Sequence, residues 1–209
     1  MSAEPTVTRD QPSSAENAAP QGARSRSQHQ RRKRILQVAA ALVSRGGIEE
    51  MQMRKVAERA DVALGTLYRY FPSKEDLIVA VVSEELDLLE GSIERRPPSA
   101  DTPPRRAVAV LMRATRGLMR EPELASALIR SLLLSDVKTE FGDRMTGLLL
   151  RAAVGPDADV PDGDPRRVVA KALSSVWTME MIEMLRGHAT ADQAQARLET
   201  VAARLLHDF

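Results

Sequence analysis

Apolar residues recur every three or four positions along most of the chain, with charged and polar residues between them. This spacing is typical of amphipathic α-helices, and almost no segment shows the strict alternation of a half-buried strand. The pattern predicts an all-α fold with helices at 28–45, at 51–71, where two short helices flank a turn, and at 74–93. Further helices are predicted at 105–120, 123–134, 135–154, 165–186 and 190–206.

Breaks rich in glycine and proline divide the chain into parts. Gly46 and Gly47 end the first helix, and the proline-rich stretch 95–104 interrupts the helical pattern. Residues 1–27 contain almost no large apolar side chain, which predicts a disordered tail. We therefore predict a tail at 1–27, a small three-helix head at 28–73, and a larger helical domain at 74–209 whose first helix couples it to the head.

The stretch from Ala57 to Lys74, AERADVALGTLYRYFPSK, has the spacing of a helix-turn-helix. Two helices that cross at a steep angle need a small residue where they touch, a turn residue that tolerates positive φ, and an apolar anchor. Ala57, Asp61 and Leu67 occupy these three positions. Phe71 follows Leu67 by one helical turn, so the two share a buried face. This arrangement predicts a DNA-binding unit.

The opposite face of the second short helix carries small, hydroxylated and basic side chains, which suit close approach to phosphates and base edges. We expect Leu64 to touch a thymine methyl group, Thr66 and Tyr68 a base edge or phosphate, and Arg69 and Lys74 phosphates. The alternative is that the tyrosines are ordinary core aromatics. The predicted DNA-binding residues are Arg54, Leu64, Gly65, Thr66, Tyr68, Arg69 and Lys74.

Charge is distributed unevenly, although the net charge is only +1. Residues 1–76 carry 13 basic and 9 acidic side chains, whereas residues 77–209 carry 17 and 20. No acidic residue occurs between Asn17 and Ile48, and the predicted first turns of helix 28–45 are basic. The basic excess therefore lies where DNA is expected. Arg24 and Arg26 either reach into a minor groove or belong to a merely solvated tail.

Several kinds of chemistry are excluded or disfavoured by residue usage. The chain has no cysteine, and its three histidines are dispersed, so neither a thiolate site nor a histidine-based triad is expected. The aspartate-rich loop 155–164 lacks the glycine and glutamate that a calcium-binding EF-hand loop requires, because Asp162 and Val168 stand at those positions. We therefore expect no metal, no cofactor and no enzymatic activity; an enzyme using the helical cavity is the rival hypothesis.

No apolar run approaches the roughly 20 residues of a membrane span. The first residues are polar and include proline, unlike a secretion signal. These features predict a cytoplasmic protein that does not associate with membranes.

At VAERADVALGTLYRYFPSKEDL the sequence resembles the tetracycline-repressor family of bacterial regulators. Two positions depart from the family pattern, because Asp61 replaces the usual turn glycine and Gln52 the usual Ser or Thr before the first short helix. Asp tolerates the left-handed backbone region better than most residues, whereas Gln is a poorer helix cap. The resemblance implies a regulator of transcription with an N-terminal helix-turn-helix head and a C-terminal helical domain for ligand binding and dimerisation.

The same resemblance implies a small-molecule effector site in the larger domain and a homodimer formed through the last two helices. The implied function is repression at a palindromic operator on double-stranded DNA; an activator of the same fold and a protein-interaction module are alternatives. Flexible methionine side chains suit an irregular apolar ligand, although each is also an ordinary core residue. The candidate ligand-binding residues are Met112, Met119, Leu132, Met145, Leu149, Trp177 and Met181.

A finer resemblance is to the KstR-like subgroup, the actinobacterial repressors of cholesterol catabolism. It is carried by RRKRIL, by QMRKVAERADVALGTLYRYFPSK and by SSVWTMEMIEMLRGHATADQAQARL. These segments cover the head and the last two helices, and the middle of the chain matches poorly. The subgroup implies a steroid or a steroid-derived acyl-CoA thioester as effector.

Overall fold

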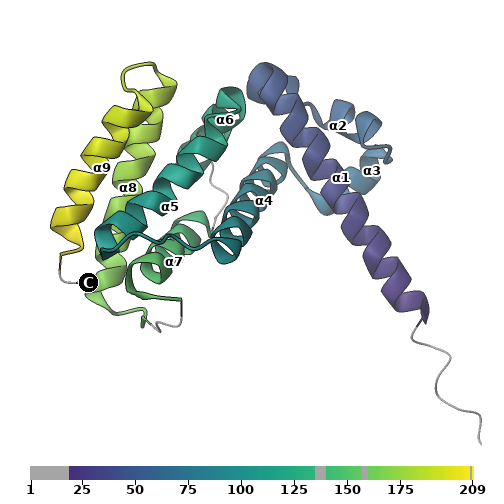
Figure 1. Ribbon diagram of the computed structural model, residues 1–209. Helices are drawn as coiled ribbons and strands as arrows, with labels where there is room; N and C mark the ends of the chain where they lie inside the picture. The colour runs from purple at the N-terminus through teal and green to yellow at the C-terminus, as the bar shows by residue number, and fades with distance from the viewer. Residues whose placement is uncertain (1–18, 135–139, 157–159, 208) are drawn as a thin grey trace, which may run out of the picture.

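The computed structural model describes residues 19–134, 140–156, 160–207 and 209. These residues form nine α-helices and no strand, so the all-α prediction is confirmed. The head contains α1 (Ala19–Glu50), α2 (Met53–Arg59) and α3 (Leu64–Tyr70), and the larger body contains α4 (Lys74–Arg95), α5 (Pro103–Leu118), α6 (Pro122–Leu134), α7 (Phe141–Val154), α8 (Pro165–Leu185) and α9 (Ala191–Leu205). Figure 1 shows head and body side by side, joined by α4.

Helix α1 begins at Ala19, well before the predicted start at residue 28. Residues 1–18 of the predicted tail lie outside the described residues, but 19–27 are helical, so the prediction of disorder is wrong there. Once Ile35 and Leu36 anchor the helix in a core, each added residue contributes a hydrogen bond without a new nucleation cost. The basic residues 31–34 consequently lie within the helix, and not in its first turns as predicted.

Gly46 and Gly47 bend α1 where the sequence predicts its end. Gly47 has φ 66° and ψ −168°, a backbone region that is open to glycine almost alone. Residues 48–50 resume the helix in a new direction. The glycine pair therefore ends the straight part of α1.

The turn between α2 and α3 contains the strained residue that the sequence predicts. Asp61 has φ 52° and is the one non-glycine residue with positive φ among those described. Arg34 on α1 donates a 2.8 Å hydrogen bond from Nε to the carbonyl of Ala60, so a cation caps the C-terminal end of α2. Gln52, at the opposite end, makes no side-chain capping bond, as expected for a poor cap.

A hydrophobic core joins the three head helices to parts of the body. Leu67 and Phe71 are buried in it, which confirms the predicted inner face of α3. Ile35 and Leu42 of α1 and Val56 of α2 pack in the same core. The first half of α4 contributes Leu77, Ile78, Val81 and Val82, and α6 contributes Leu124, Ala127 and Leu128. The head is therefore packed directly on two body helices.

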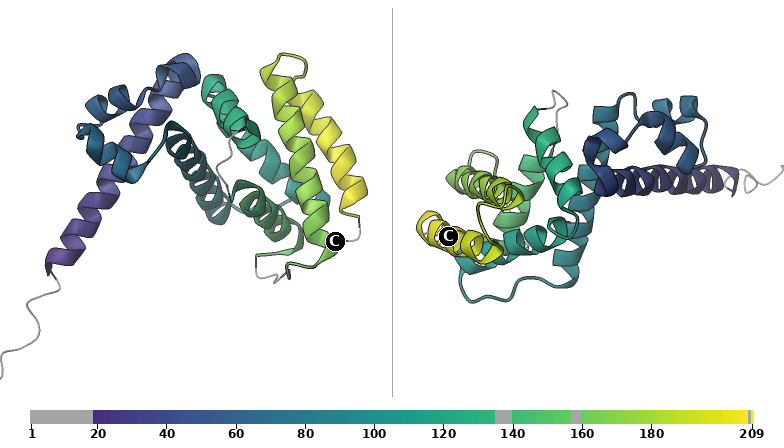
Figure 2. Two further views of the ribbon diagram at one scale, coloured as in Figure 1. Left: turned by 180° about the vertical axis from the view of Figure 1, so that it is seen from behind. Right: turned by 90° about the horizontal axis from the view of Figure 1, so that it is seen from above.

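The second core lies between α5, α7, α8 and α9, which cluster away from the head (Figure 2). Leu86, in the second half of α4, belongs to this core, whereas Leu77 belongs to the head core. Arg106 on α5 donates from Nε to the carbonyl of Ala152 at 2.8 Å and from Nη2 to that of Ala153 at 2.7 Å. It thereby satisfies carbonyl groups at the end of α7 that the helix leaves unpaired.

The body helices begin and end close to their predicted bounds. The exception is α7, which begins at Phe141, whereas the prediction began at residue 135; residues 135–139 lie outside the described part. Ser73 caps α4 by accepting a 3.0 Å hydrogen bond from the backbone N–H of Asp76, and the Asp76 carboxylate accepts from the N–H of Ser73 at 3.1 Å. These two reciprocal bonds form a capping box.

None of the helices in the described ranges combines the length and the apolar character that crossing a membrane requires.

Truncating the apolar anchor of α3, the recognition helix of the predicted helix-turn-helix, should destabilise the head. We expect Leu67→Ala to lower the free energy of unfolding by about 2–5 kcal/mol, because Leu67 is fully buried and the change leaves a cavity. Urea unfolding followed by far-UV circular dichroism measures the effect. Leu133→Ala is the control, because Leu133 is 59% exposed and its loss should change stability by less than about 0.5 kcal/mol. Equal effects of the two changes would contradict the assigned inner face.

Candidate DNA interface and ligand cavity

The outer face of α3 is open to solvent. The large amphipathic side chain of Tyr68 is 45% exposed, and Arg69 beside it is exposed as well. A Cβ atom placed on the exposed Gly65 would meet no other atom within 4 Å, so another molecule can approach the backbone there. Thr66 is half-buried, and Leu64 is half-buried where it packs against the head core. The alternative that Tyr68 is a core aromatic is wrong.

Two further predicted residues flank this face. Arg54 lies in the first turn of α2 and is exposed. Lys74 is the first residue of α4, directly after the Ser73 cap, and is half-buried. The capping box fixes the backbone at Lys74, so the base of its side chain has a defined place beside α3. Contact of any of these residues with DNA remains a prediction.

Part of the basic run on α1 is engaged within the head. The Arg32 guanidinium lies 5.7 Å from the centre of the Phe71 ring, in a cation–π contact. Arg34 is hydrogen-bonded to the Ala60 carbonyl. Lys33 is exposed. Of the two arginines predicted either to reach a minor groove or to be merely solvated, the Arg24 side chain lies outside the described residues and Arg26 is exposed, so both alternatives stay open.

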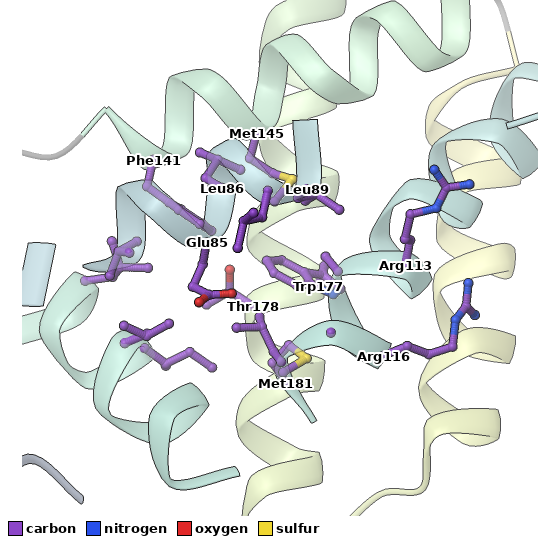
Figure 3. A pocket seen from close by; sticks show the side chains of 18 of the residues that line it. Glu85, Leu86, Leu89, Arg113, Arg116, Phe141, Met145, Trp177, Thr178 and Met181 are labelled. Carbon is purple, nitrogen blue, oxygen red and sulfur yellow. The ribbon is translucent and has the colours of Figure 1, made fainter. Parts of the chain in front are cut away.

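The body has a partly open cavity of about 370 Å³ between α4, α5, α6, α7 and α8 (Figure 3). Its wall is mainly apolar, with Leu86, Leu89, Phe141, Met145 and Met181 among the lining residues. A cavity of this size and character suits a small, largely apolar ligand.

The structure brings together four of the seven predicted ligand-binding residues. Leu132, Met145, Trp177 and Met181 line the cavity. The other three do not line it: Met112 and Leu149 are buried in the body core, and Met119 is half-buried against that core. Residue type indicated an apolar interior but did not distinguish the side of a helix that faces the cavity from the side that faces another helix.

Trp177 is held in the cavity wall by a buried hydrogen bond. Its Nε1 donates to Thr115 Oγ1 at 2.9 Å, and the Thr115 hydroxyl donates to the carbonyl of Leu111 at 2.9 Å. Both side chains are almost completely buried. The bond satisfies the one polar group of the indole and fixes the ring plane against the cavity.

One acidic residue in the wall was missed by the sequence analysis. Glu85 lies on α4 among apolar lining residues, and its partial burial, with smaller contributions from Glu121 and Glu84, raises the pKa of its carboxyl group. Arg113, Arg116 and Arg120 line the cavity as well. Figure 3 shows Arg113 and Arg116 pointing away from Glu85. The signal in the sequence was a glutamate on the apolar face of α4, between Val82 and Leu89.

The acidic and histidine side chains of the described ranges are the groups that could bind a metal ion. No group of three or more histidine, aspartate or glutamate side chains there is arranged to hold a metal ion. Asp157 and Asp159 of the aspartate-rich loop lie outside these ranges. Asp164 accepts from the backbone N–H of Arg166 at 2.8 Å and so caps α8, which is a structural role.

Removing the hydroxyl that holds Trp177 should destabilise the body. We expect Thr115→Val, which keeps the shape of the side chain, to cost about 1–3 kcal/mol because the buried indole N–H loses its acceptor. Thermal and urea unfolding measure this change. In the control Thr146→Val, the hydroxyl that is lost bonds only to a helix carbonyl, Gly142, so a smaller change is expected. A neutral Thr115→Val would show that the indole finds another partner.

Comparison with known proteins gives concordant results. Residues 35–81 match the bacterial regulatory proteins of the tetR family. The HTH-type transcriptional repressor KstR of Rhodococcus jostii is 38% identical over 189 residues, which cover 88% of this chain and 86% of that repressor. KstR of Mycolicibacterium smegmatis is 36% identical, with 87% and 89% covered. The predicted resemblance to the KstR-like subgroup is confirmed.

A solved structure supports the same assignment. A TetR transcriptional regulator from Rhodococcus sp. RHA1 has a TM-score of 0.79 at 31% identity, and the match covers 88% of this chain and 99% of that one. The relatives named here are regulators of transcription, so this chain is a DNA-binding transcriptional regulator and not an enzyme. It belongs to the tetR family of bacterial regulatory proteins.

Proposed function

We propose that this regulator is a homodimeric repressor that binds a palindromic operator through α3 and leaves it when a small molecule fills the cavity. One observation carries the proposal: α4 begins directly after the recognition helix and also lines the cavity. A ligand that changes the position of α4 therefore changes the position of α3. A coupling free energy of about 1–3 kcal/mol lowers operator affinity by roughly 5- to 150-fold.

The proposed dimer interface lies on the outer face of α8. Val168 and Met179 are 71% and 57% exposed, and the small residues Ala172 and Ser175 are exposed between them at helical spacing. These four residues form an apolar stripe that nothing in the described chain covers. Small side chains allow two helices to approach closely, so a second copy of α8 can pack against this stripe.

In the proposed dimer, two copies of α3 related by the two-fold axis would face the DNA from the same side. Helix-turn-helix dimers of this kind read two half-sites about 34 Å apart, one turn of DNA. The operator would then be an inverted repeat, because each half-site meets the same protein surface.

The proposed effector is apolar or amphipathic. The cavity wall of methionine, leucine, phenylalanine and tryptophan side chains supports an apolar body, and lining arginines support an anionic end. A steroid has the apolar body, and an acyl-CoA-like thioester has both features. The KstR proteins of Rhodococcus jostii and Mycolicibacterium smegmatis are named repressors, which supports repression by this chain.

Selection of bound fragments from genomic DNA tests the proposal most directly. We expect an inverted repeat bound by two protomers, with affinity that falls steeply as salt rises, because phosphate contacts release counterions. Candidate effectors added to this complex should release the DNA. An activator would bind the same repeat but raise transcription from a reporter, and a protein-interaction module would select no common sequence.

Removing a charge from the face of α3 should weaken DNA binding through phosphate contacts. For Arg69→Ala we expect weaker binding to all sequences and a salt slope smaller by about 1, because one fewer phosphate is neutralised. Fluorescence anisotropy with the selected duplex at several salt concentrations measures both quantities. Arg151→Ala, an exposed arginine on α7, is the matched control and should leave the slope unchanged. An unchanged slope for Arg69→Ala would remove this residue from the interface.

Placing a charge on the α8 stripe should dissociate the dimer. Met179→Glu buries one carboxylate from each protomer without a partner, so we expect the dimer Kd to rise by about 100-fold or more. Sedimentation equilibrium measures the change. Leu133→Glu is the control, because Leu133 is equally exposed on α6 and lies outside the proposed interface. Monomers formed by the control but not by Met179→Glu would place the interface elsewhere.

A further inference from the structure

Glu85 is a carboxylate in an otherwise apolar part of the cavity wall. Its α4 neighbours in the lining are Val82, Leu86 and Leu89, and Figure 3 shows its carboxylate turned toward Trp177 and Thr178 across the cavity. Among the described residues it has no hydrogen bond and no ion pair. A half-buried carboxylate without a donor is unfavourable unless something else supplies one.

The side-chain donors of Trp177, Thr178 and Arg113, which Figure 3 labels in the same wall, are already engaged. The indole N–H of Trp177 is given to Thr115 Oγ1, and the Thr178 hydroxyl donates to the carbonyl of Ser174 at 3.1 Å. Arg113 points away and donates from Nη1 to the carbonyls of Ser92 at 3.1 Å and Arg96 at 2.8 Å. The wall around Glu85 therefore presents an unpaired acceptor, the carboxylate, because the side-chain donors around it bond to other atoms.

Neighbouring charges also favour a donor or a cation beside Glu85. Glu84 on the same helix and Glu121 between α5 and α6 both act on Glu85 as like charges, and together with burial they raise the pKa of its carboxyl group. Glu121 itself accepts a hydrogen bond from the Ser44 hydroxyl of α1. No cation contributes to the shift. The surroundings of Glu85 are thus acidic, while Arg113 and Arg116 point away from it.

We propose that Glu85 is a specificity-determining residue that selects effectors carrying a hydrogen-bond donor, a hydroxyl or an ammonium group, on an apolar body. The inference rests on the proposed effector function of the cavity and names the polar group its ligand must present. A ligand donor placed between Glu85 and Trp177 supplies the hydrogen bond that no protein group makes to this carboxylate. A purely apolar ligand leaves the carboxylate buried and unpaired. The ligand then bonds directly to α4, the helix that follows the recognition helix.

A matched set of probes tests this selection with the full-length protein. Decan-1-ol donates a hydrogen bond, decyl methyl ether does not, and decylamine adds a positive charge. Trp177 is the only tryptophan in the chain and lines the cavity, so its fluorescence reports binding. We expect the alcohol to bind about tenfold or more tightly than the ether, because a hydrogen bond to a charged group is that strong.

Variants separate the carboxylate from the rest of the wall. In Glu85→Leu we expect the preference for alcohol over ether to disappear. In Glu85→Gln, which keeps an acceptor oxygen without charge, the preference for the alcohol should persist and any preference for the amine should be lost. Glu94→Leu is the matched control, since Glu94 is an exposed glutamate on the same helix that neither lines the cavity nor contributes to the pKa shift of Glu85; it should keep the wild-type preferences. Far-UV circular dichroism and binding to the selected duplex check that each variant is folded.

The outcomes distinguish this inference from the proposed function. Equal binding of alcohol and ether by the wild-type protein, or a preference that survives in Glu85→Leu, overturns the role of Glu85 while the cavity remains a ligand site. Failure of all three probes to change Trp177 emission overturns the cavity as an effector site, and the role of Glu85 with it. A tenfold preference for the alcohol over the ether that is lost only in Glu85→Leu supports the selection. The affinity for decylamine then shows whether a positive charge strengthens the hydrogen bond.

Discussion

The structure depends on one helix being buried in two hydrophobic cores at once. The first half of α4 packs Leu77 and Val81 with the head, and its second half packs Leu86 with the body. A close-packed interior resists gradual deformation, so movement at one end of such a helix is transmitted to the other end. The Ser73 capping box at the head end and the salt bridge between Arg144 and Glu90 at 2.8 Å fix where α4 begins and how it meets α7. This shared helix links the cavity to α3, and α6, which packs in both cores and also lines the cavity, is a second link.

The fold was largely predictable because its signals are local. Helical periodicity located the helices, and the alternation of inner and outer positions around Leu67 and Phe71 identified the two faces of α3. The early start of α1 was not predictable, because residues 19–27 have no apolar stripe and are helical by continuation from the anchored segment. The contact of α6 with the head core was also missed, since sequence spacing shows which face is buried and not which partner covers it.

The cavity was less predictable than the recognition helix for a physical reason. A lining residue and a core residue are both apolar, so Met145 in the wall and Met112 in the core have the same signature in the sequence. Polar residues give better information in such a domain, because each needs a partner. Thr115 has one in Trp177, whereas Glu85 has none among the described residues, and that difference is visible only when the helices are placed together. Arg34 shows the converse, since a side chain in the basic run of α1 is a structural cap.

The bend at Gly47 has a consequence for sequence variation. Its combination of φ 66° and ψ −168° admits scarcely any residue with a Cβ atom, although the position is only half-buried and touches no ligand. Backbone geometry, and not packing or chemistry, therefore determines which residues can occupy position 47. Among descendants of this protein, Gly47 should persist through substitutions that freely alter the neighbouring surface, because a residue with a Cβ atom would strain the backbone at the bend.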